Sequence, residues 1–110
     1  MKVKTMDGEP VVIFSTAGPD TAGRIARELV EKRLAACVNM AEIRSCYRWE
    51  GEFCDDDETL LIIKTVREKI EQVTEAILSI HTYELPEILV LPVISGFGPY
   101  LQWMIEETLR

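Results

Sequence analysis

The residues best suited to chemistry are a single histidine, His81, and three widely spaced cysteines, Cys37, Cys46 and Cys54. Imidazole and thiolate groups bind transition metals and can also take part in proton transfer or nucleophilic attack. The cysteines lack the C-x-x-C spacing of a structural zinc site, although Cys46 and Cys54 could bind a soft metal across a hairpin. His81 could equally bond to a carbonyl at a helix end, and Cys37 could be a small buried hydrophobic residue.

The sequence contains no recognisable catalytic constellation. A serine or cysteine nucleophile would have only His81 as its base, and no Gly-x-Ser-x-Gly motif surrounds any serine. A glycine-rich phosphate loop followed by lysine is absent. The acidic run Asp55–Glu58 lacks the glycine and the alternating oxygen ligands of a calcium loop. We therefore expect that the protein is not an enzyme.

Aromatic residues with a polar edge lie near the predicted ends of elements, where a packed core needs them least. They are Tyr47, Trp49, Tyr83, Tyr100 and Trp103. Tyrosine and tryptophan favour protein interfaces and small-molecule pockets. Lys64, at the end of an otherwise apolar strand, is the best candidate for a functional charge in such a pocket.

Three short apolar stretches predict strands that position these residues. Pro10–Thr16 and Leu60–Ile63 are continuously apolar, which is typical of strands buried on both faces. Glu87–Gly96 is also predicted to be a strand. Proline cannot donate to a strand ladder, so Pro92 places this last strand at a sheet edge or at a bulge.

Three helices are predicted from apolar residues at helical spacing. The first covers Pro19–Arg33. A capping box at Thr65–Glu68 opens the second, which ends near His81. The third begins at Gly98 and continues towards the C-terminus.

The stretch Arg33–Gly51 predicts a strand of unusual length. In the later half of this stretch, the apolar side chains occupy odd-numbered positions, as the two-residue period of a strand requires. In the earlier half, they occupy even-numbered positions instead. We therefore predict a bend or bulge near Met40–Glu42. A strand this long is expected to form an arm that reaches past its own domain.

The turn that follows this strand can contain two or three residues. With two, Cys46 and Cys54 would face opposite sides of the hairpin; with three, they would be diagonal neighbours on one side. The three-residue turn also pairs Trp49 with Phe53, and we mildly prefer it.

The order of elements predicts an α+β fold, a ferredoxin-like βαββαβ sandwich with a long hairpin and an extra C-terminal helix. Two helices cover one face of the sheet in that fold. Because the strands are apolar on both faces, the second face also needs a cover, and we expect a homo-oligomer. Residues 10–110 are predicted to form a single domain, and residues 1–9 a flexible N-terminal tail.

Composition excludes several classes of partner. A net charge of −7 argues against nucleic-acid binding, which needs clustered Lys and Arg. No apolar run approaches the roughly 20 residues that cross a bilayer, so no membrane partner is expected. The N-terminal segment lacks the apolar core of a secretory signal. An odd number of cysteines at wide spacing fits a reducing compartment, and we predict a cytoplasmic protein.

Five motifs follow one another along the chain. They are Arg33–Asn39 (RLAACVN), Ser45-x-Tyr47-x-Trp49-x-Gly51, Glu58 with Leu61–Thr65 (LIIKT), His81-x-Tyr83-Glu84-x-Pro86-Glu87, and Tyr100-Leu101-x-Trp103. Together they resemble the CutA family of divalent-cation tolerance proteins over residues 10–110. The resemblance implies a ferredoxin-like protomer in a homotrimer whose long hairpins wrap neighbouring subunits. It also implies a similarity of architecture to the trimeric PII-type nitrogen regulators.

The resemblance also suggests site residues. It implies that a cleft between subunits is lined by Lys64, Glu58, Tyr83, Glu84, Tyr100 and Trp103. Family members are associated with copper tolerance and can bind Cu(II) or other divalent cations, which makes His81 and Cys37 the candidate metal ligands. Copper-binding members can have a cysteine late in the first strand and paired histidines at the second helix end. Ser15 and Ile80 stand at those places here.

Three hypotheses for function remain at this point. The first is a non-enzymatic trimer that binds a divalent metal or a small ligand, with a role in metal homeostasis or signalling. The second is a small-molecule enzyme that uses Lys64 and Glu58 with His81 as a proton carrier. The third is a structural assembly scaffold whose cleft residues serve only interface packing.

Overall fold

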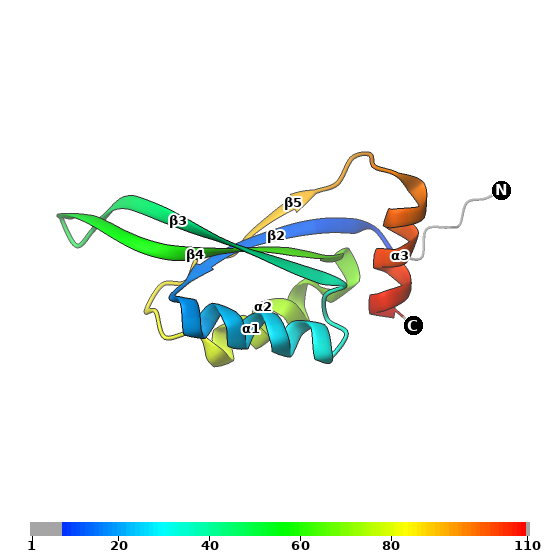
Figure 1. Ribbon diagram of the computed structural model, residues 1–110, viewed down its shortest axis with the longest axis horizontal. Helices are drawn as coiled ribbons and strands as arrows, with labels where there is room; N and C mark the ends of the chain where they lie inside the picture. The colour runs from blue at the N-terminus through cyan, green and yellow to red at the C-terminus, as the bar shows by residue number, and fades with distance from the viewer. Residues whose placement is uncertain (1–7, 110) are drawn as a thin grey trace.

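One antiparallel sheet organises the computed structural model, which describes residues 8–109 (Figure 1). The elements are β2 (Pro10–Ala17), α1 (Pro19–Glu31), β3 (Cys37–Trp49), β4 (Glu52–Val66), the 3-10 turn η1 (Arg67–Lys69), α2 (Ile70–Ile80), β5 (Leu89–Pro92) and α3 (Gly98–Leu109). The four strands of the sheet lie in the order β3-β4-β2-β5. This arrangement confirms the predicted α+β, ferredoxin-like order with an additional C-terminal helix. It also confirms that Pro92 belongs to an edge strand.

Helices α1 and α2 cover only one face of the sheet (Figure 1). From Pro10 to Ser15 in β2 and from Glu58 to Thr65 in β4, buried side chains alternate with half-buried ones, so these parts of the strands are buried on one face and not on both. The covered face and the two helices form the core, whose largest fully buried members include Ile13, Ile25, Leu29, Leu61, Ile63 and Ile77. We call the other side of the sheet the open face. Its side chains include those of Cys37, Val12, Phe14, Leu60, Ile62, Lys64, Leu89 and Leu91.

Strands β3 and β4 form one uninterrupted hairpin that projects beyond the helices (Figure 1). The register is constant from Cys37 opposite Lys64 to Trp49 opposite Glu52, so the predicted bulge near Met40–Glu42 is wrong. The apolar side chains of β3 change from even-numbered to odd-numbered positions for another reason. Strand β2 ends at Ala17, and past this point the hairpin has no neighbouring strand on that side. We call residues 43–58, the projecting part of the hairpin, the arm.

A two-residue turn, Glu50-Gly51, connects the two strands of the arm. Both residues have positive φ angles, 51° and 82°, as the tightest hairpin turns require. The preferred three-residue turn is therefore wrong. Cys54 pairs with Tyr47 and Cys46 pairs with Asp55, so the two cysteines face opposite sides of the hairpin.

The predicted capping box at Thr65–Glu68 is also wrong. Strand β4 continues to Val66, and α2 begins only at Ile70, after the 3-10 turn. The Thr65 hydroxyl is buried and donates to the carbonyl oxygen of Leu34 at 2.7 Å. Thr65 therefore holds the segment before β3 against the sheet instead of opening a helix.

The folded body begins before the predicted boundary at residue 10. Gly8 is buried, and a Cβ added to it would meet Ile105 at 3.0 Å. The carbonyl of Glu9 accepts the Arg67 N–H at 2.7 Å, and their side chains form an ion pair at 2.7 Å. Gly8 and Glu9 are thus part of the domain. The rest of the predicted tail, residues 1–7, lies outside the described residues.

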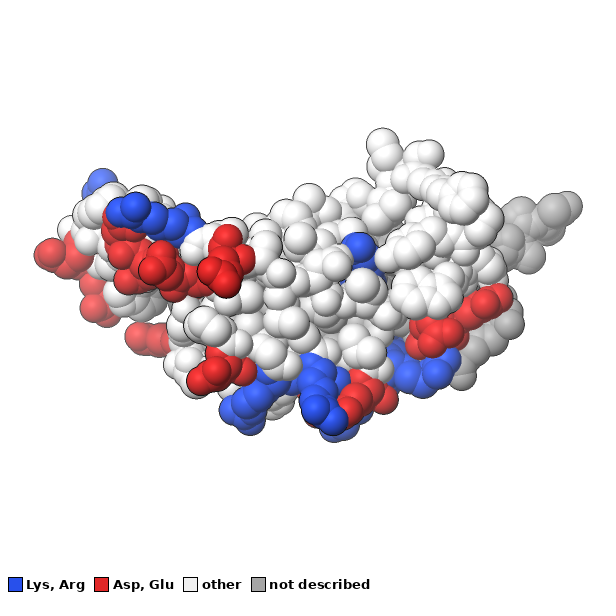
Figure 2. Space-filling view, viewed as in Figure 1, with Lys and Arg blue, Asp and Glu red and all other residues white. Residues whose placement is uncertain are grey.

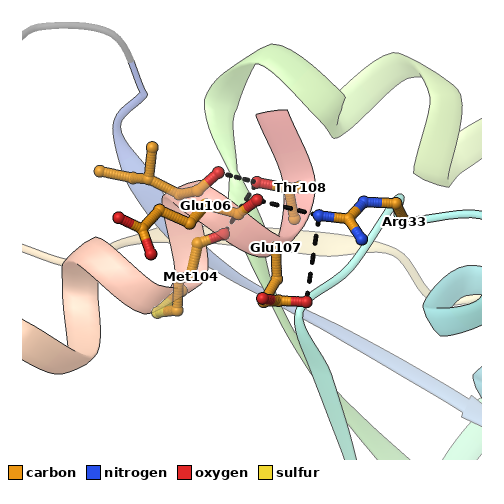
Figure 3. Close-up of polar contacts among 6 residues, drawn as sticks. Arg33, Met104, Glu106, Glu107 and Thr108 are labelled. Atoms are coloured by element: carbon orange, nitrogen blue, oxygen red, sulfur yellow. Dashed lines mark hydrogen bonds and ion pairs between the residues drawn. The ribbon is translucent and has the colours of Figure 1, made fainter. Parts of the chain in front are cut away.

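Arg33 fixes the C-terminal end of α3 (Figure 3). Its backbone has a φ angle of 58°, just after α1. Its Nη2 donates to the carbonyl of Glu106 at 3.1 Å and lies 4.0 Å from Oε1 of Glu107. A cation at this position also suits the negative end of the helix dipole. The contact holds α3 against the sheet, where the helix touches β4 and β2.

Within residues 8–109, no helix is both long enough and apolar enough to cross a membrane.

Candidate functional site

The predicted pocket residues fall into two groups on the open face. In the first group, the Lys64 ammonium lies 5.6 Å from the centre of the Tyr100 ring, within range of a cation–π contact. The Tyr100 and Trp103 rings lie 5.4 Å apart on α3. Cys37 is the cross-strand partner of Lys64. This first group therefore combines one cation with two aromatic rings and a thiol.

The second group lies where the arm leaves the body. The Tyr83 hydroxyl donates to Oε2 of Glu58 at 2.8 Å. The Tyr47 hydroxyl donates to Oδ2 of Asp56 at 2.5 Å. Beside these contacts is a cavity of about 440 Å³, which we call the arm hollow. It is lined by Tyr47, Trp49, Asp56, Asp57, Tyr83, Glu84 and Leu85.

The two groups do not form one pocket within a protomer. Lys64 and Glu58 lie on the same face of β4, six residues apart. At roughly 3.3 Å per residue, about 20 Å of strand separates them. Lys64, Tyr100 and Trp103 therefore form one cluster, and Glu58, Tyr83 and Glu84 belong to another.

His81 has protein partners for both ring nitrogens. Nε2 lies 2.7 Å from the carbonyl oxygen of Thr16, and Nδ1 accepts the backbone N–H of Tyr83 at 3.1 Å. These partners assign the proton to Nε2, since a carbonyl oxygen can only accept. The ring also packs on Tyr83 with centroids 4.5 Å apart. His81 thus ties the end of α2 to β2, and the carbonyl it bonds is not one from its own helix.

A single protomer does not fit a metal centre. His81 lies beside Thr16, whereas Cys37 is in the strand row of Lys64 and Val12, four residues away along β2. Among residues 8–109, no three His, Cys, Asp or Glu side chains gather closely enough to hold a metal ion. The metal-binding roles of His81 and Cys37 remain predictions, and they would require donors from more than one subunit.

Burial and nearby carboxylates raise the pKa values of both tyrosines in the arm hollow. Partial burial, followed by the hydrogen bond to Glu58, raises the pKa of Tyr83 from 10.0 to about 12. The hydrogen bond to Asp56 raises the pKa of Tyr47 as well. On the opposite face of the arm, Arg44 donates to both oxygens of Asp55 and lowers the pKa of that carboxyl group.

These shifts predict that alkaline pH weakens the attachment of the arm. Because the pKa of Tyr83 is higher in the fold than in the unfolded chain, its stabilising contribution is complete below pH 10.0 and is lost as the pH rises through about 12. In an ultraviolet absorbance titration, Tyr83→Phe should lose the rise centred near pH 12. Tyr100→Phe is the control and should keep it. An unchanged late rise in Tyr83→Phe would contradict the assignment.

Sequence reasoning found part of the arm hollow. It singled out Tyr47, Trp49, Tyr83 and Glu84 by residue type or motif. It missed the role of Asp56, Asp57 and Leu85. The signal for Asp56 is its cross-strand position, which becomes readable only when the hairpin turn is known to have two residues.

An antiparallel sheet with helices on one face and a projecting hairpin places the chain among proteins with a PII-like α+β fold. The PII-like protein CutA from Nostoc sp. PCC 7120, in apo form, has the same fold, with a TM-score of 0.85 and 35% sequence identity over 89% of this chain and 96% of that chain. The model of the CutA1 divalent ion tolerance protein family matches residues 11–107, and the chain belongs to this family.

Two relatives support this membership. The divalent-cation tolerance protein CutA of Thermus thermophilus is 42% identical over 101 residues, which are 91% of this chain and 98% of that protein. Protein CutA of Homo sapiens is 47% identical over 88 residues, 79% of this chain and 49% of that protein. The chain thus spans about half the length of the human relative. The family is named for tolerance of divalent ions and not for a catalysed reaction.

Proposed function

We propose that this protein is a homotrimeric divalent-cation tolerance protein that binds a divalent metal or a small ligand in clefts between its subunits. Its role would lie in metal homeostasis or signalling, in the cytoplasm. One observation carries the proposal: the predicted pocket residues form two separate groups on the open face of one protomer. A second subunit can bring such groups together.

The open face supports the proposed assembly. Leu89 and Leu91 on β5 are 55% and 39% exposed, and they continue the apolar rows that contain Phe14 and Val12. An apolar surface of this kind marks an interaction site, and closed symmetry is the usual way for identical chains to bury it. The arm extends the Cα trace to 54 Å, long enough to reach a neighbouring protomer.

The charges of the two groups support a cleft between subunits. Lys64 with its aromatic neighbours offers a cation, and Glu58 and Glu84 offer carboxylates. If each cleft pairs one group with the other group of a neighbour, it contains opposite charges and aromatic walls, which suits small polar ligands. A divalent metal such as Cu(II) would take donors from both sides, and His81 and Cys37 are the candidates.

Native mass spectrometry of protein purified gently from its own cells tests the proposal. The expected result is an assembly of three 12.5 kDa chains that retains a metal ion or a small molecule. A monomer without any bound species would overturn the assembly and the cleft together.

The metal part needs its own measurement. Titration of Cu(II) into wild type, His81→Ala and Cys37→Ala should show weaker binding in at least one variant, because imidazole and thiolate are strong copper ligands. Cys46→Ala is the matched control, since Cys46 is exposed on the side of the arm opposite Cys54. Equal binding in all four proteins would remove both residues from the site.

A further inference from the structure

We propose that His81 is a positioning residue and not a metal ligand: it holds Tyr83 so that the tyrosine hydroxyl fixes the carboxylate of Glu58 where the arm leaves the body. This inference rests on the proposed function only in counting Tyr83 and Glu58 among the residues of the cleft. Every contact that carries it lies within one protomer. It therefore does not depend on the number of subunits.

The position of His81 gives its ring two partners at once. The residue follows α2 directly, and its backbone is extended, with φ −63° and ψ 144°. From there Nδ1 accepts the N–H of Tyr83, two residues on, at 3.1 Å, which is the bond that asparagine makes in an Asx-turn. Nε2 lies 2.7 Å from the carbonyl oxygen of Thr16 on β2. Both ends of the imidazole are thus anchored to backbone groups.

These two partners leave the ring no lone pair for a metal. A neutral imidazole has one N–H and one lone pair. Since the carbonyl oxygen of Thr16 can only accept, the proton is on Nε2, and the lone pair on Nδ1 is the one that the Tyr83 N–H uses. A metal ion binds through the lone pair of a neutral ring nitrogen. It could therefore use His81 only by displacing one of these two bonds.

The ring of His81 also determines where the side chain of Tyr83 lies. The two rings pack with centroids 4.5 Å apart and an interplanar angle of 53°. Tyr83 is 39% exposed, so a packed core does not hold it in place. His81 therefore contacts both the backbone and the ring of Tyr83, and the tyrosine hydroxyl remains available for Glu58.

Glu58 depends on this hydroxyl for its orientation. The Tyr83 hydroxyl donates to Oε2 of Glu58 at 2.8 Å. Among residues 8–109, no Lys or Arg forms an ion pair with Glu58. Figure 2 shows acidic side chains gathered on the arm, beside a concave and largely uncharged surface over the middle of the molecule. Because like charges on the arm repel this carboxylate, a fixed neutral donor is what keeps it in one place.

Three substitutions of His81 separate its two bonds. His81→Asn keeps an acceptor for the Tyr83 N–H but is too short to reach Thr16. His81→Gln can donate to the Thr16 carbonyl but leaves the Tyr83 N–H without an acceptor, and His81→Ala loses both bonds. Amide hydrogen exchange at Tyr83, measured by NMR on the full-length protein, should be about tenfold faster than wild type in His81→Gln and His81→Ala, and within about twofold of wild type in His81→Asn. Equal exchange in His81→Asn and His81→Gln would overturn the inference.

The effect of Tyr83→Phe on unfolding shows whether His81 positions the hydroxyl. This substitution removes a group that bonds to Glu58 and forms no hydrogen bond to His81. It should raise the equilibrium constant for unfolding about fivefold in wild type and in His81→Asn, but less than about twofold in His81→Gln. All variants are compared at one protein concentration. An undiminished effect of Tyr83→Phe in His81→Gln would mean that His81 only stabilises the end of α2, and the inference would be rejected.

Titration of Cu(II) separates this inference from the proposed function. His81→Ala should bind copper as tightly as wild type, which leaves Cys37→Ala as the variant in which binding weakens. Weaker copper binding in His81→Ala would overturn the inference and support the metal site of the proposed function. Conversely, a monomer in native mass spectrometry would reject the cleft between subunits without affecting the contacts of His81 within one protomer.

Discussion

Leu89→Asp is expected to abolish the trimer and to leave a folded protomer. Leu89 is 55% exposed in the protomer and lies on the open face, opposite Phe14 in the neighbouring strand. In a separate protomer, a carboxylate at this position stays in water and costs little. Between subunits it would be buried without a partner, which costs about 3–5 kcal/mol at each site. Light scattering should therefore give the mass of one 12.5 kDa chain, against three for wild type.

Leu78→Asp is a closely matched control for this experiment. Leu78 is 54% exposed, but it belongs to α2, on the covered side of the sheet. The same substitution at the same exposure should leave the trimer intact, because this helix surface is not part of the proposed interface. If Leu89→Asp keeps the wild-type mass, or if both variants dissociate, the open face is not the surface through which the subunits assemble.

The element order was predictable because local patterns determine it. Proline at the edge strand, glycine and proline before α3, and apolar spacing in α1 all act over a few residues. The predicted bulge is wrong because the positions of the apolar side chains in β3 depend on where another strand, β2, ends. Strand β2 ends at Ala17, so the covered face of the hairpin loses its neighbouring strand near Glu42. The sequence of β3 alone does not indicate where β2 ends.

The candidate site was predictable only where a motif marked it. Tyr83 and Glu84 were found, whereas Asp56 depends on a hairpin register that one additional turn residue would have shifted. For His81 the sequence left two interpretations open. The partner that explains its position, the carbonyl of Thr16, lies 65 residues earlier in the chain. Contacts of this separation follow from tertiary packing and not from local propensity.

Two buried hydroxyl groups in the core should respond to removal with opposite signs. Thr65 and Ser15 both lie on the covered face and are 0% exposed. The Thr65 hydroxyl donates to the carbonyl of Leu34 at 2.7 Å. The Ser15 hydroxyl has no hydrogen-bond partner among the described residues. A buried polar group is costly unless it is bonded, so the same chemical group stabilises one site and destabilises the other.

Thr65→Val is expected to lower the free energy of unfolding by about 1–3 kcal/mol, because valine keeps the shape of threonine but leaves the Leu34 carbonyl without its donor. Ser15→Ala should instead raise it by about 1 kcal/mol, since alanine removes an unpaired hydroxyl and almost no volume. Chemical unfolding should be measured at one protein concentration, because oligomer stability depends on concentration. A loss of stability in Ser15→Ala would mean that its hydroxyl has a partner in solution. A gain in Thr65→Val would mean that the bond to Leu34 does not hold the segment before β3 in place.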